Sequence, residues 1–354
     1  MRVLITGGSG FIGGYFAESL RARGDEMVIL DLAEPTGPAA GIPHLIGDVR
    51  DPEAVRAALT HLGEPVDHVV HLAAAHHDFG IERKTYFDVN EGSARVLGDA
   101  MDELGVRDLT FYSTVAIYGD APEPVTEDSP KQAFTPYGES KWTAEQAFME
   151  WTQRNAADNA GRRCLTIRPT VTFGPRNFAN MYSLIRQVAG GKYLQIGPGK
   201  NIKSLSYVEN IVAATLYLWE KPGGADYDPY NWIDKPDKTS REIGEAVFRS
   251  LGKGKPPPAL PMWVGLMLGL PFDIVIKLTG KNLPVSTARI KKLFAAQTKY
   301  EADKIAAAGF EAEISLDEGI DRMVKWYQAQ GKSETAEWRL PPAEPLEFRA
   351  PAPA

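Results

Sequence analysis

A tyrosine and a lysine four residues apart have the side chains needed for acid–base chemistry. Tyr137 and Lys141 stand in the segment Tyr-Gly-Glu-Ser-Lys, and residues at positions i and i+4 lie on one face of a helix. A free tyrosine has a pKa of about 10, and a neighbouring ammonium group lowers it by favouring the phenolate. The phenolate can remove the proton of a carbinol while a hydride leaves for an acceptor. The pair therefore predicts proton-coupled hydride transfer.

A glycine-rich turn near the N-terminus is suited to hold the hydride acceptor. Gly7, Gly10 and Gly13 form a GxxGxxG pattern between an expected strand and an expected helix, with Phe11 and Ile12 in the same turn. Glycines allow a tight turn and close backbone approach, and the N–H groups at a helix N-terminus favour a pyrophosphate. The pattern in this setting predicts a dinucleotide site.

Asp31 indicates which dinucleotide is bound. It closes the second expected strand, where a carboxylate accepts hydrogen bonds from the ribose hydroxyls of NAD and repels the 2′-phosphate of NADP. Leu32 and Ala33 follow it, so no adjacent arginine offers a phosphate partner. The sequence predicts NAD, with Asp48 and Val49 beside the adenine.

The elements that must position these groups alternate along the first half of the chain. Short β-branched runs predict strands at residues 3–5, 27–30, 69–72 and 109–112. Apolar residues recur at helical spacing from residue 11 to 20, and Asp51-Pro52 is typical of a helix start. This alternation predicts the α/β class, with a Rossmann doubly wound parallel sheet.

The regular pattern ends at about residue 168. Gly, Pro and Asn punctuate residues 172–204, which predicts loops that grip a ligand, and a helix is expected again at 208–220. The predicted domain organisation places the NAD-binding domain at 1–172 with 206–235 returning to it. A smaller, mixed C-terminal substrate-binding lobe is expected at 173–205 and 236–330, and a Pro-rich tail, extended or disordered, at 331–354.

Bulk composition limits the partners. The net charge of −7 argues against nucleic acid, because binding to phosphate backbones needs a cationic face. Cys164 is the only cysteine, which excludes an intrachain disulfide and fits a reducing compartment. No CxxC pair or HExxH motif predicts a metal site. The N-terminus lacks the apolar core of a signal peptide, so a cytoplasmic location is expected.

An uncharged apolar segment lies at residues 256–272 and includes five prolines. The prolines leave about ten contiguous helical residues, too few to span a hydrocarbon core of about 30 Å. We therefore expect no integral membrane span and a buried helix of the C-terminal lobe. Contact with a membrane surface and an apolar wall of the substrate site are the alternatives.

Taken together, the motifs resemble the extended short-chain dehydrogenase/reductase family, of the NAD-dependent epimerase/dehydratase type. The matching segments occur in family order over roughly residues 1–330 and comprise 6–14, Asp31, 47–49, 71–74, Asn90, 113–119, Tyr137 with Lys141, and 168–169. The resemblance implies that Thr114 is catalytic beside Tyr137 and Lys141, and that Ser113 lines the nicotinamide pocket. It also implies further cofactor contacts at Leu72, Ala73, Ala74, Asn90, Tyr137, Lys141, Arg168 and Pro169. His71 is expected to be a structural residue at a strand end rather than a general base.

Within the family, residues 173–182 and 196–210 resemble nucleotide-sugar 4-epimerases and sugar 4-ketoreductases of polysaccharide pathways. The resemblance implies a nucleotide-diphosphate sugar held by Asn177, Asn180 and Lys203. C4 would be oxidised and re-reduced through a 4-keto intermediate, and the chain would form a homodimer through the helices that follow Asn90 and Tyr137.

Two departures bear on the reaction. Val115 and Ala116 stand where nucleotide-sugar dehydratases carry an acidic pair, which excludes elimination chemistry. Val171 stands where many UDP-sugar epimerases carry an asparagine. A nucleotide-sugar dehydrogenase or 4-ketoreductase, and a 3β-hydroxysteroid or sterol-type dehydrogenase suggested by residues 207–210 and 259–270, therefore remain alternatives. A non-catalytic NAD sensor is disfavoured because the Tyr137/Lys141 pair is intact.

Overall fold

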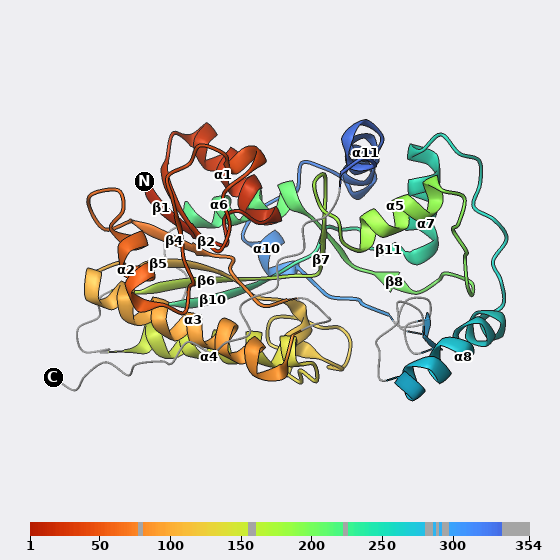
Figure 1. Cartoon of the computed structure of the whole chain (residues 1–354), viewed down its shortest axis with the longest axis horizontal. Coiled ribbons are helices and arrows are strands. Elements are labelled where there is room, and N and C mark those ends of the chain that lie inside the picture. The colour runs from red at the N-terminus through yellow and green to blue at the C-terminus, as the bar shows by residue number, and fades with distance from the viewer. Residues whose placement is uncertain are drawn as a thin grey trace.

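The computed structural model describes residues 1–76, 81–154, 161–221, 226–279, 286–287, 290–291 and 297–334. Elements carry the labels of Figure 1. The expected Pro-rich tail lies outside the described residues from position 335 onward.

The largest described sheet has seven parallel strands in the order β10-β6-β5-β4-β1-β2-β3. These strands are β1 (Arg2–Thr6), β2 (Glu26–Asp31), β3 (His44–Ile46), β4 (His68–His71), β5 (Asp108–Tyr112), β6 (Arg163–Pro169) and β10 (Tyr227–Trp232). The chain moves outward from β1 to β3 and then returns to β4 on the other side of β1. Ligands of doubly wound sheets bind at the carboxyl ends of the strands, where this order reverses. The predicted strands and the predicted fold class are confirmed.

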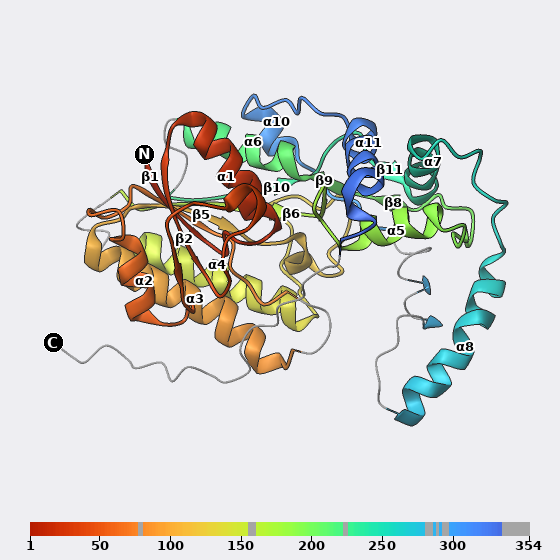
Figure 2. The ribbon, with the colours of Figure 1, turned by 45° about the horizontal axis from the view of Figure 1, so that its top comes forward.

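Helices cover both faces of this sheet (Figure 2). One face carries α1 (Phe11–Arg23) and α6 (Val208–Trp219), and the other carries α2 (Pro52–Leu59), α3 (Arg83–Leu104) and α4 (Pro136–Gln153). Their apolar sides and the two faces of the sheet form two buried clusters. Helix boundaries follow local chemistry: the Asp51 side chain caps α2 by accepting from Glu53 N, and Gly24 ends α1 in the left-handed region at φ 80°.

A second group of elements extends from the carboxyl side of the sheet (Figure 1). Its apolar core joins α5, α7 and α11 to the small sheet of β7 and β9, and β8 pairs with β11 in a second small sheet. The elements are β7 (Val171–Phe173), α5 (Asn180–Ala189), β8 (Ile202–Lys203), β9 (Leu205–Tyr207), β11 (Lys238–Thr239), α7 (Ser240–Ser250), α8 (Met262–Thr279), α11 (Leu316–Trp326) and η4 (Tyr327–Gly331). The short helix α10 (Asp303–Ala307) packs instead against β10 of the seven-stranded sheet. The 3₁₀ turns η1 (Gly37–Ala39) and η2 (Val115–Tyr118) belong to the first part of the chain.

Two expectations for this second part are wrong. Residues 172–204 include the helix α5, whose apolar positions Met181, Ile185 and Val188 are buried, so the segment is not loop alone. The apolar segment after residue 256 is not a buried helix. It forms α8, an 18-residue helix with Pro271 in its interior, and α8 exposes most of its large side chains. No helix in the described part of the chain is long and apolar enough to cross a membrane.

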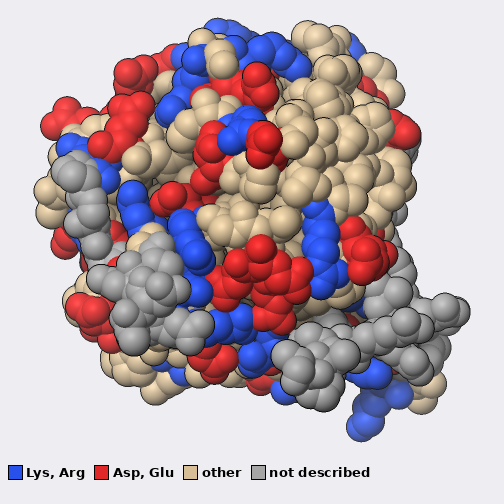
Figure 3. All heavy atoms as spheres, turned by 90° about the vertical axis from the view of Figure 1, so that its left-hand side faces the viewer, with Lys and Arg blue, Asp and Glu red and all other residues tan. Residues whose placement is uncertain are grey.

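Ion pairs lie at the end of the molecule that carries the N label in Figure 1. Arg2 pairs with Asp67, and Arg163 pairs with Asp108, at the amino ends of the strands. Figure 3 looks onto this end of the molecule and shows acidic and basic side chains intermingled over it. The functional groups predicted from the sequence lie at the opposite, carboxyl edge of the sheet.

Candidate active site

The glycine turn after β1 leaves no room for side chains. Gly7 has φ 71°, and a Cβ atom there would lie 2.6 Å from the backbone nitrogen of Ala73, which follows β4. A Cβ atom at Gly13 would collide with the carbonyl oxygen of Gly8. Gly10 is the N-cap of α1 and makes no side-chain cap hydrogen bond. The first turn of α1 therefore presents N–H groups to an anion at the point where the strand order reverses.

Two acidic residues lie beside this turn: Asp31 ends β2, and Asp48 follows β3. The Asp31 carboxylate accepts hydrogen bonds from Ser9 N at 3.0 Å and Ala33 N at 3.2 Å, so it is fixed against the glycine turn. The Asp48 carboxylate instead receives the guanidinium of Arg50, with Nη2 to Oδ2 at 2.7 Å. Arg50 is buried, and this ion pair holds the loop that leads to Val49 at the expected adenine end.

Helix α4, which carries Tyr137 and Lys141, begins at a well-defined cap. The Thr135 side chain accepts from Gly138 N, and Pro136 occupies the first turn, which is a favoured position for proline. Tyr137 is half-buried, whereas Lys141 is 2% exposed. The Lys141 ammonium lies 4.2 Å from the centroid of the Phe111 ring on β5.

The environment of Lys141 is unusual for a lysine. Burial lowers the pKa of its ammonium group to about 7, although the negative charge of Glu145 opposes the shift. Among the residues that the structure describes, it takes part in no hydrogen bond or ion pair. A buried cation with a strongly perturbed pKa at the edge of the sheet is typical of a functional group.

Thr114 lies on the turn that meets α4. It is the N-cap of η2, and its Oγ1 accepts from Ala116 N at 3.1 Å. A Cβ atom at Gly138 would lie 2.6 Å from the Ala116 carbonyl oxygen. The turn capped by Thr114 and the first turn of the Tyr137 helix are therefore in direct backbone contact.

Asn90 joins three elements behind Tyr137. Its Oδ1 accepts from Ala75 N at 2.9 Å, and its Nδ2 donates to Ala75 O at 3.1 Å and to Ser140 Oγ at 2.9 Å. Ser140 Oγ in turn donates to the Tyr137 carbonyl oxygen at 2.9 Å. This chain of bonds links α3, the loop after β4 and α4.

His71 and Arg168 are engaged inside the protein. His71 shares hydrogen bonds with Thr6 Oγ1 and Ser93 Oγ, and burial lowers its pKa to about 3. The prediction that His71 has a structural role at a strand end is confirmed. Arg168, followed by Pro169 at the end of β6, forms a two-bond ion pair with Glu145 on α4, at 3.0 and 2.6 Å. Burial opposes the charge of Arg168, but Glu145 raises the pKa of the guanidinium overall.

The residues expected to hold the substrate lie on three separate elements. Asn177 Oδ1 accepts from Ala179 N at 2.8 Å, and Asn180 is exposed at the start of α5. Lys203 lies on β8, paired with Lys238 of β11 and bridged to Thr298. The structure brings these residues to the side of the molecule that continues from the carboxyl edge of the sheet.

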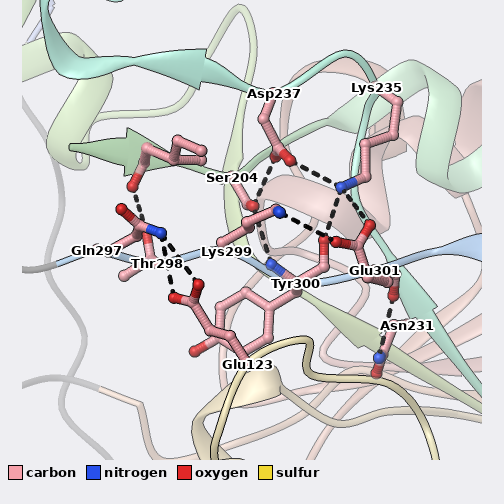
Figure 4. Close-up of polar contacts among 11 residues, drawn as sticks. Glu123, Ser204, Asn231, Lys235, Asp237, Gln297, Thr298, Lys299, Tyr300 and Glu301 are labelled. Atoms are coloured by element: carbon pink, nitrogen blue, oxygen red, sulfur yellow. Dashed lines mark hydrogen bonds and ion pairs between the residues drawn. The ribbon is translucent and has the colours of Figure 1, made fainter. Parts of the chain in front are cut away.

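The segment from Gln297 to Glu301 connects this lobe to the Rossmann part (Figure 4). Lys235 Nζ donates to Asp237 Oδ2 at 2.7 Å, to the Tyr300 carbonyl oxygen at 2.7 Å and to Glu301 Oε2 at 2.9 Å. Gln297 Nε2 reaches Glu123 at 3.0 Å. These bonds fix the extended segment that runs beside Lys203.

Sequence reasoning missed Ser140, Glu145 and Arg50, all of which organise the site. Glu145 follows Lys141 by four residues, so helical spacing would have placed it on the same face as Tyr137 and Lys141. Ser140 and Arg50 carry no comparable signal, because their partners Asn90 and Asp48 become neighbours only in the folded chain or through a local turn.

The residues at this edge fit a nicotinamide dinucleotide. Ser113 Oγ is buried and has no hydrogen-bond partner in the described part of the chain. It follows β5, next to Thr114, where the nicotinamide was expected. Close packing at Gly7, the uncapped start of α1 and the fixed carboxylate of Asp31 are the features that a pyrophosphate and a ribose would require here.

Comparison with known proteins also indicates a family that depends on NAD. The family model described as "NAD dependent epimerase/dehydratase family" matches residues 3–231. The chain is 38% identical over 332 residues to the N-acetyl-alpha-D-glucosaminyl-diphospho-ditrans,octacis-undecaprenol 4-epimerase of Escherichia coli O157:H7, covering 94% of this chain and 97% of that protein. It is 35% identical over 285 residues to the UDP-glucose 4-epimerase of Streptomyces lividans, covering 73% of this chain and 84% of that protein.

A solved structure is similar over nearly the whole chain. The UDP-glucose 4-epimerase of Thermus thermophilus, crystallised in complex with NAD, superimposes with a TM-score of 0.70 at 25% identity. The match covers 93% of this chain and 100% of that chain.

Proposed function

Because the chain belongs to the NAD-dependent epimerase/dehydratase family, we propose that it is a 4-epimerase that inverts C4 of a sugar carried on a diphosphate. Its cofactor is NAD. The observation that carries the proposal is the Tyr137/Lys141 pair, placed on α4 with the Lys141 ammonium buried against Phe111 beside the cofactor edge. Val115 and Ala116 hold the places of the dehydratase acids, so the site lacks the groups for elimination.

Each catalytic side chain has one task. The Tyr137 hydroxyl exchanges a proton with the C4 oxygen of the sugar, and the nearby Lys141 ammonium favours the phenolate form. Thr114 Oγ1 lies on the turn in contact with α4 and orients the C4 oxygen toward Tyr137 by a hydrogen bond. NAD, when bound, supplies a reversible hydride acceptor. The other proposed site residues keep the roles expected from the sequence. Asn90 and Arg168, expected as cofactor contacts, act as supports instead, because their polar atoms bind Ala75, Ser140 and Glu145.

Epimerisation requires that the diphosphate stays anchored while the 4-keto sugar turns. We assign the anchored end to Lys203, Asn177 and Asn180. Lys203 provides a point charge rather than the bidentate fork of an arginine. Its bridge to Thr298, in the fixed segment from Gln297 to Glu301, supports this assignment. Val171, 40% exposed on β7, leaves the anchoring of the diphosphate to these three residues.

The carrier on the diphosphate is either a nucleotide or a polyprenol. A nucleotide follows from the family resemblance and from the UDP-glucose 4-epimerases that this chain resembles. A polyprenol is favoured by one observation: the 4-epimerase that matches 94% of this chain acts, by its name, on a diphospho-undecaprenol sugar. We give the polyprenol the first place and keep the nucleotide sugar as the second candidate.

The remaining organisation is part of the same proposal. The NAD-binding domain comprises residues 1–172 with 206–235, the substrate lobe comprises 173–205 and 236–330, and the enzyme works in polysaccharide biosynthesis in the cytoplasm. A homodimer through α3 and α4 would not use Phe148 or Trp151, since both are buried in the core of their own domain. It would instead pair charged surfaces such as that around Arg95.

The test is a product analysis with both carriers. The purified protein is incubated with NAD and either a polyprenyl-diphosphate-linked N-acetylhexosamine or the matching UDP-sugar, and the released sugars are separated by chromatography. We expect the C4 epimer to accumulate to equilibrium without net NADH. A keto product with stoichiometric NADH would make the enzyme a dehydrogenase, and no change in either sugar would refute the proposed substrate class.

A further inference from the structure

Helix α8 turns its large apolar side chains outward. Six of them are between 51% and 80% exposed: Trp263, Met267, Leu268, Leu270, Ile274 and Leu278. Figure 2 shows the helix projecting at the edge of the molecule, away from the seven-stranded sheet. Exposed apolar surface of this extent marks a protein or membrane contact.

The inward side of α8 is made of small residues. A Cβ atom at Gly265 would lie 2.6 Å from Ile196 Cγ2, and one at Gly269 would lie 2.9 Å from Thr287 N. Asp273 accepts a hydrogen bond of 2.6 Å from Thr287 Oγ1. The helix therefore packs against the protein through its glycines and its single acid, which fixes the apolar side chains in their outward orientation.

The sequence around α8 is basic within an acidic protein. Residues 251–296 contain seven lysines and arginines and one acidic residue, Asp273, whereas the whole chain has a net charge of −7. Lys277 is exposed on α8 itself. Apolar helices with neighbouring lysines bind the headgroup region of anionic bilayers. A second copy of this chain placed face to face would bring like charges together, so charge complementarity favours a lipid surface.

The chain segments before and after α8 are hydrogen-bonded to elements beside the proposed diphosphate site. Before the helix, Leu260 N donates to Gln195 O at 2.8 Å. After it, Thr298 N donates to Ile202 O at 3.0 Å, and the bonds of Figure 4 hold the segment that continues from Thr298. Lys203 directly follows Ile202 in the chain. An α8 seated on a membrane would thus hold Lys203 close to the bilayer surface, where a lipid-linked diphosphate resides.

We propose that α8 docks the protein on an anionic phospholipid bilayer, with its apolar side chains at the boundary between headgroups and acyl chains and the neighbouring lysines on anionic headgroups. The inference extends the lipid-linked form of the proposed function and rests on it for its purpose, but the binding itself is independent of catalysis.

The experiment measures binding without any substrate. The full-length protein is sedimented with vesicles of phosphatidylethanolamine and phosphatidylglycerol, and with vesicles of phosphatidylcholine alone. We expect recruitment to the anionic vesicles that weakens with salt, and less recruitment to phosphatidylcholine. The double variant Leu268→Glu/Leu278→Glu should bind the anionic vesicles at least about tenfold more weakly, because it places charges in the apolar boundary region.

A matched control separates the apolar contact from net charge. Ala22→Glu/Ala57→Glu adds the same two charges at exposed positions of α1 and α2 and should bind vesicles nearly as the wild type does. All variants are checked by circular dichroism. The Leu268→Glu/Leu278→Glu variant should retain turnover of detergent-dispersed substrate.

Three outcomes would overturn the docking proposal: no recruitment of the wild type, equal recruitment of both double variants, or an α8-dependent dimer in solution that ignores vesicles. The experiments distinguish a failure of the docking proposal from a failure of the proposed function. Vesicle binding without epimerisation of any diphosphate-linked sugar would refute the proposed function alone, and epimerisation in detergent without vesicle binding would refute docking alone.

Discussion

The Asn90 side-chain amide donates a hydrogen bond of 2.9 Å to Ser140 Oγ, and through that hydroxyl it holds the backbone of Tyr137. The same side chain is bonded to both backbone groups of Ala75. One buried amide therefore sets the position of α4, which carries the proposed acid–base pair, relative to the loop after β4.

Replacing Asn90 should affect both stability and turnover. Asn90→Ala leaves the buried N–H and C=O of Ala75 unpaired, so we expect the free energy of unfolding to fall by about 1–3 kcal/mol. Ser140→Ala should cost less, about 0.5–1.5 kcal/mol. Both positioning variants should lower kcat more than they raise KM. Urea unfolding and steady-state kinetics measure these effects, and unchanged stability in Asn90→Ala would contradict the bonding scheme.

Tyr137→Phe removes the proposed acid–base group and keeps the ring. We expect turnover to fall by about 10²–10⁴-fold, with the thermal midpoint close to that of the wild type. Tyr217→Phe is the matched control, because it loses a hydrogen bond to Ala308 O on the opposite face of the sheet and should keep its turnover. Similar activity in the two variants would remove Tyr137 from the mechanism.

Lys141→Met should stabilise the cofactor-free protein while abolishing turnover. Burial lowers the pKa of Lys141 to about 7, so between about pH 7 and the normal lysine pKa the unfolded chain binds more protons than the folded one. The lysine therefore destabilises the fold fully below about pH 7, and less as the pH rises.

The measurement is the difference in thermal midpoint between Lys141→Met and the wild type at two pH values. We expect a larger gain at pH 6 than at pH 9. The buried histidines are common to both proteins, so their titration cancels in the difference. An equal gain at both pH values would contradict the perturbed pKa of Lys141.

Asp31 should select NAD through its charge. The carboxylate is fixed by Ser9 N and Ala33 N, and two charges about 4 Å apart near a protein surface interact by about 1–4 kcal/mol. Asp31→Asn removes the charge and retains a hydrogen-bond acceptor, and Asp31→Ala removes both. We expect each to narrow the preference for NAD over NADP by at least about tenfold in equilibrium titrations. A wild type that binds NADP more tightly than NAD would refute the assignment.

Much of this fold was predictable because its signals are local. The β-branched runs, the glycine turn and the Asp51 cap each depend on a few neighbouring residues, and the structure has β1, α1 and α2 where these signals lie. Tyr137 and Lys141 share a helix, so their spacing alone placed them together. The partners of Asn90 and Arg168 were not predictable, because the bonds to Ser140 and Glu145 join residues 50 and 23 positions apart.

Helix α8 shows why the burial of an apolar segment cannot be predicted from its composition alone. An uncharged apolar run normally indicates a core helix, and the prolines suggested a short one. The structure continues the helix through Pro271 and packs it by Gly265 and Gly269, so the large side chains face outward. Hydrophobicity identified an apolar surface, but only tertiary packing determines which side of the helix is covered.

The most direct test of the central claim follows the hydrogen at C4. A diphosphate-linked sugar that carries deuterium at C4 is incubated with the enzyme and catalytic NAD in a closed reaction. We expect both C4 epimers to reach equilibrium, no NADH to accumulate, and the deuterium to remain at C4 of the product. Loss of the label from C4, or a released keto sugar with stoichiometric NADH, would contradict that claim.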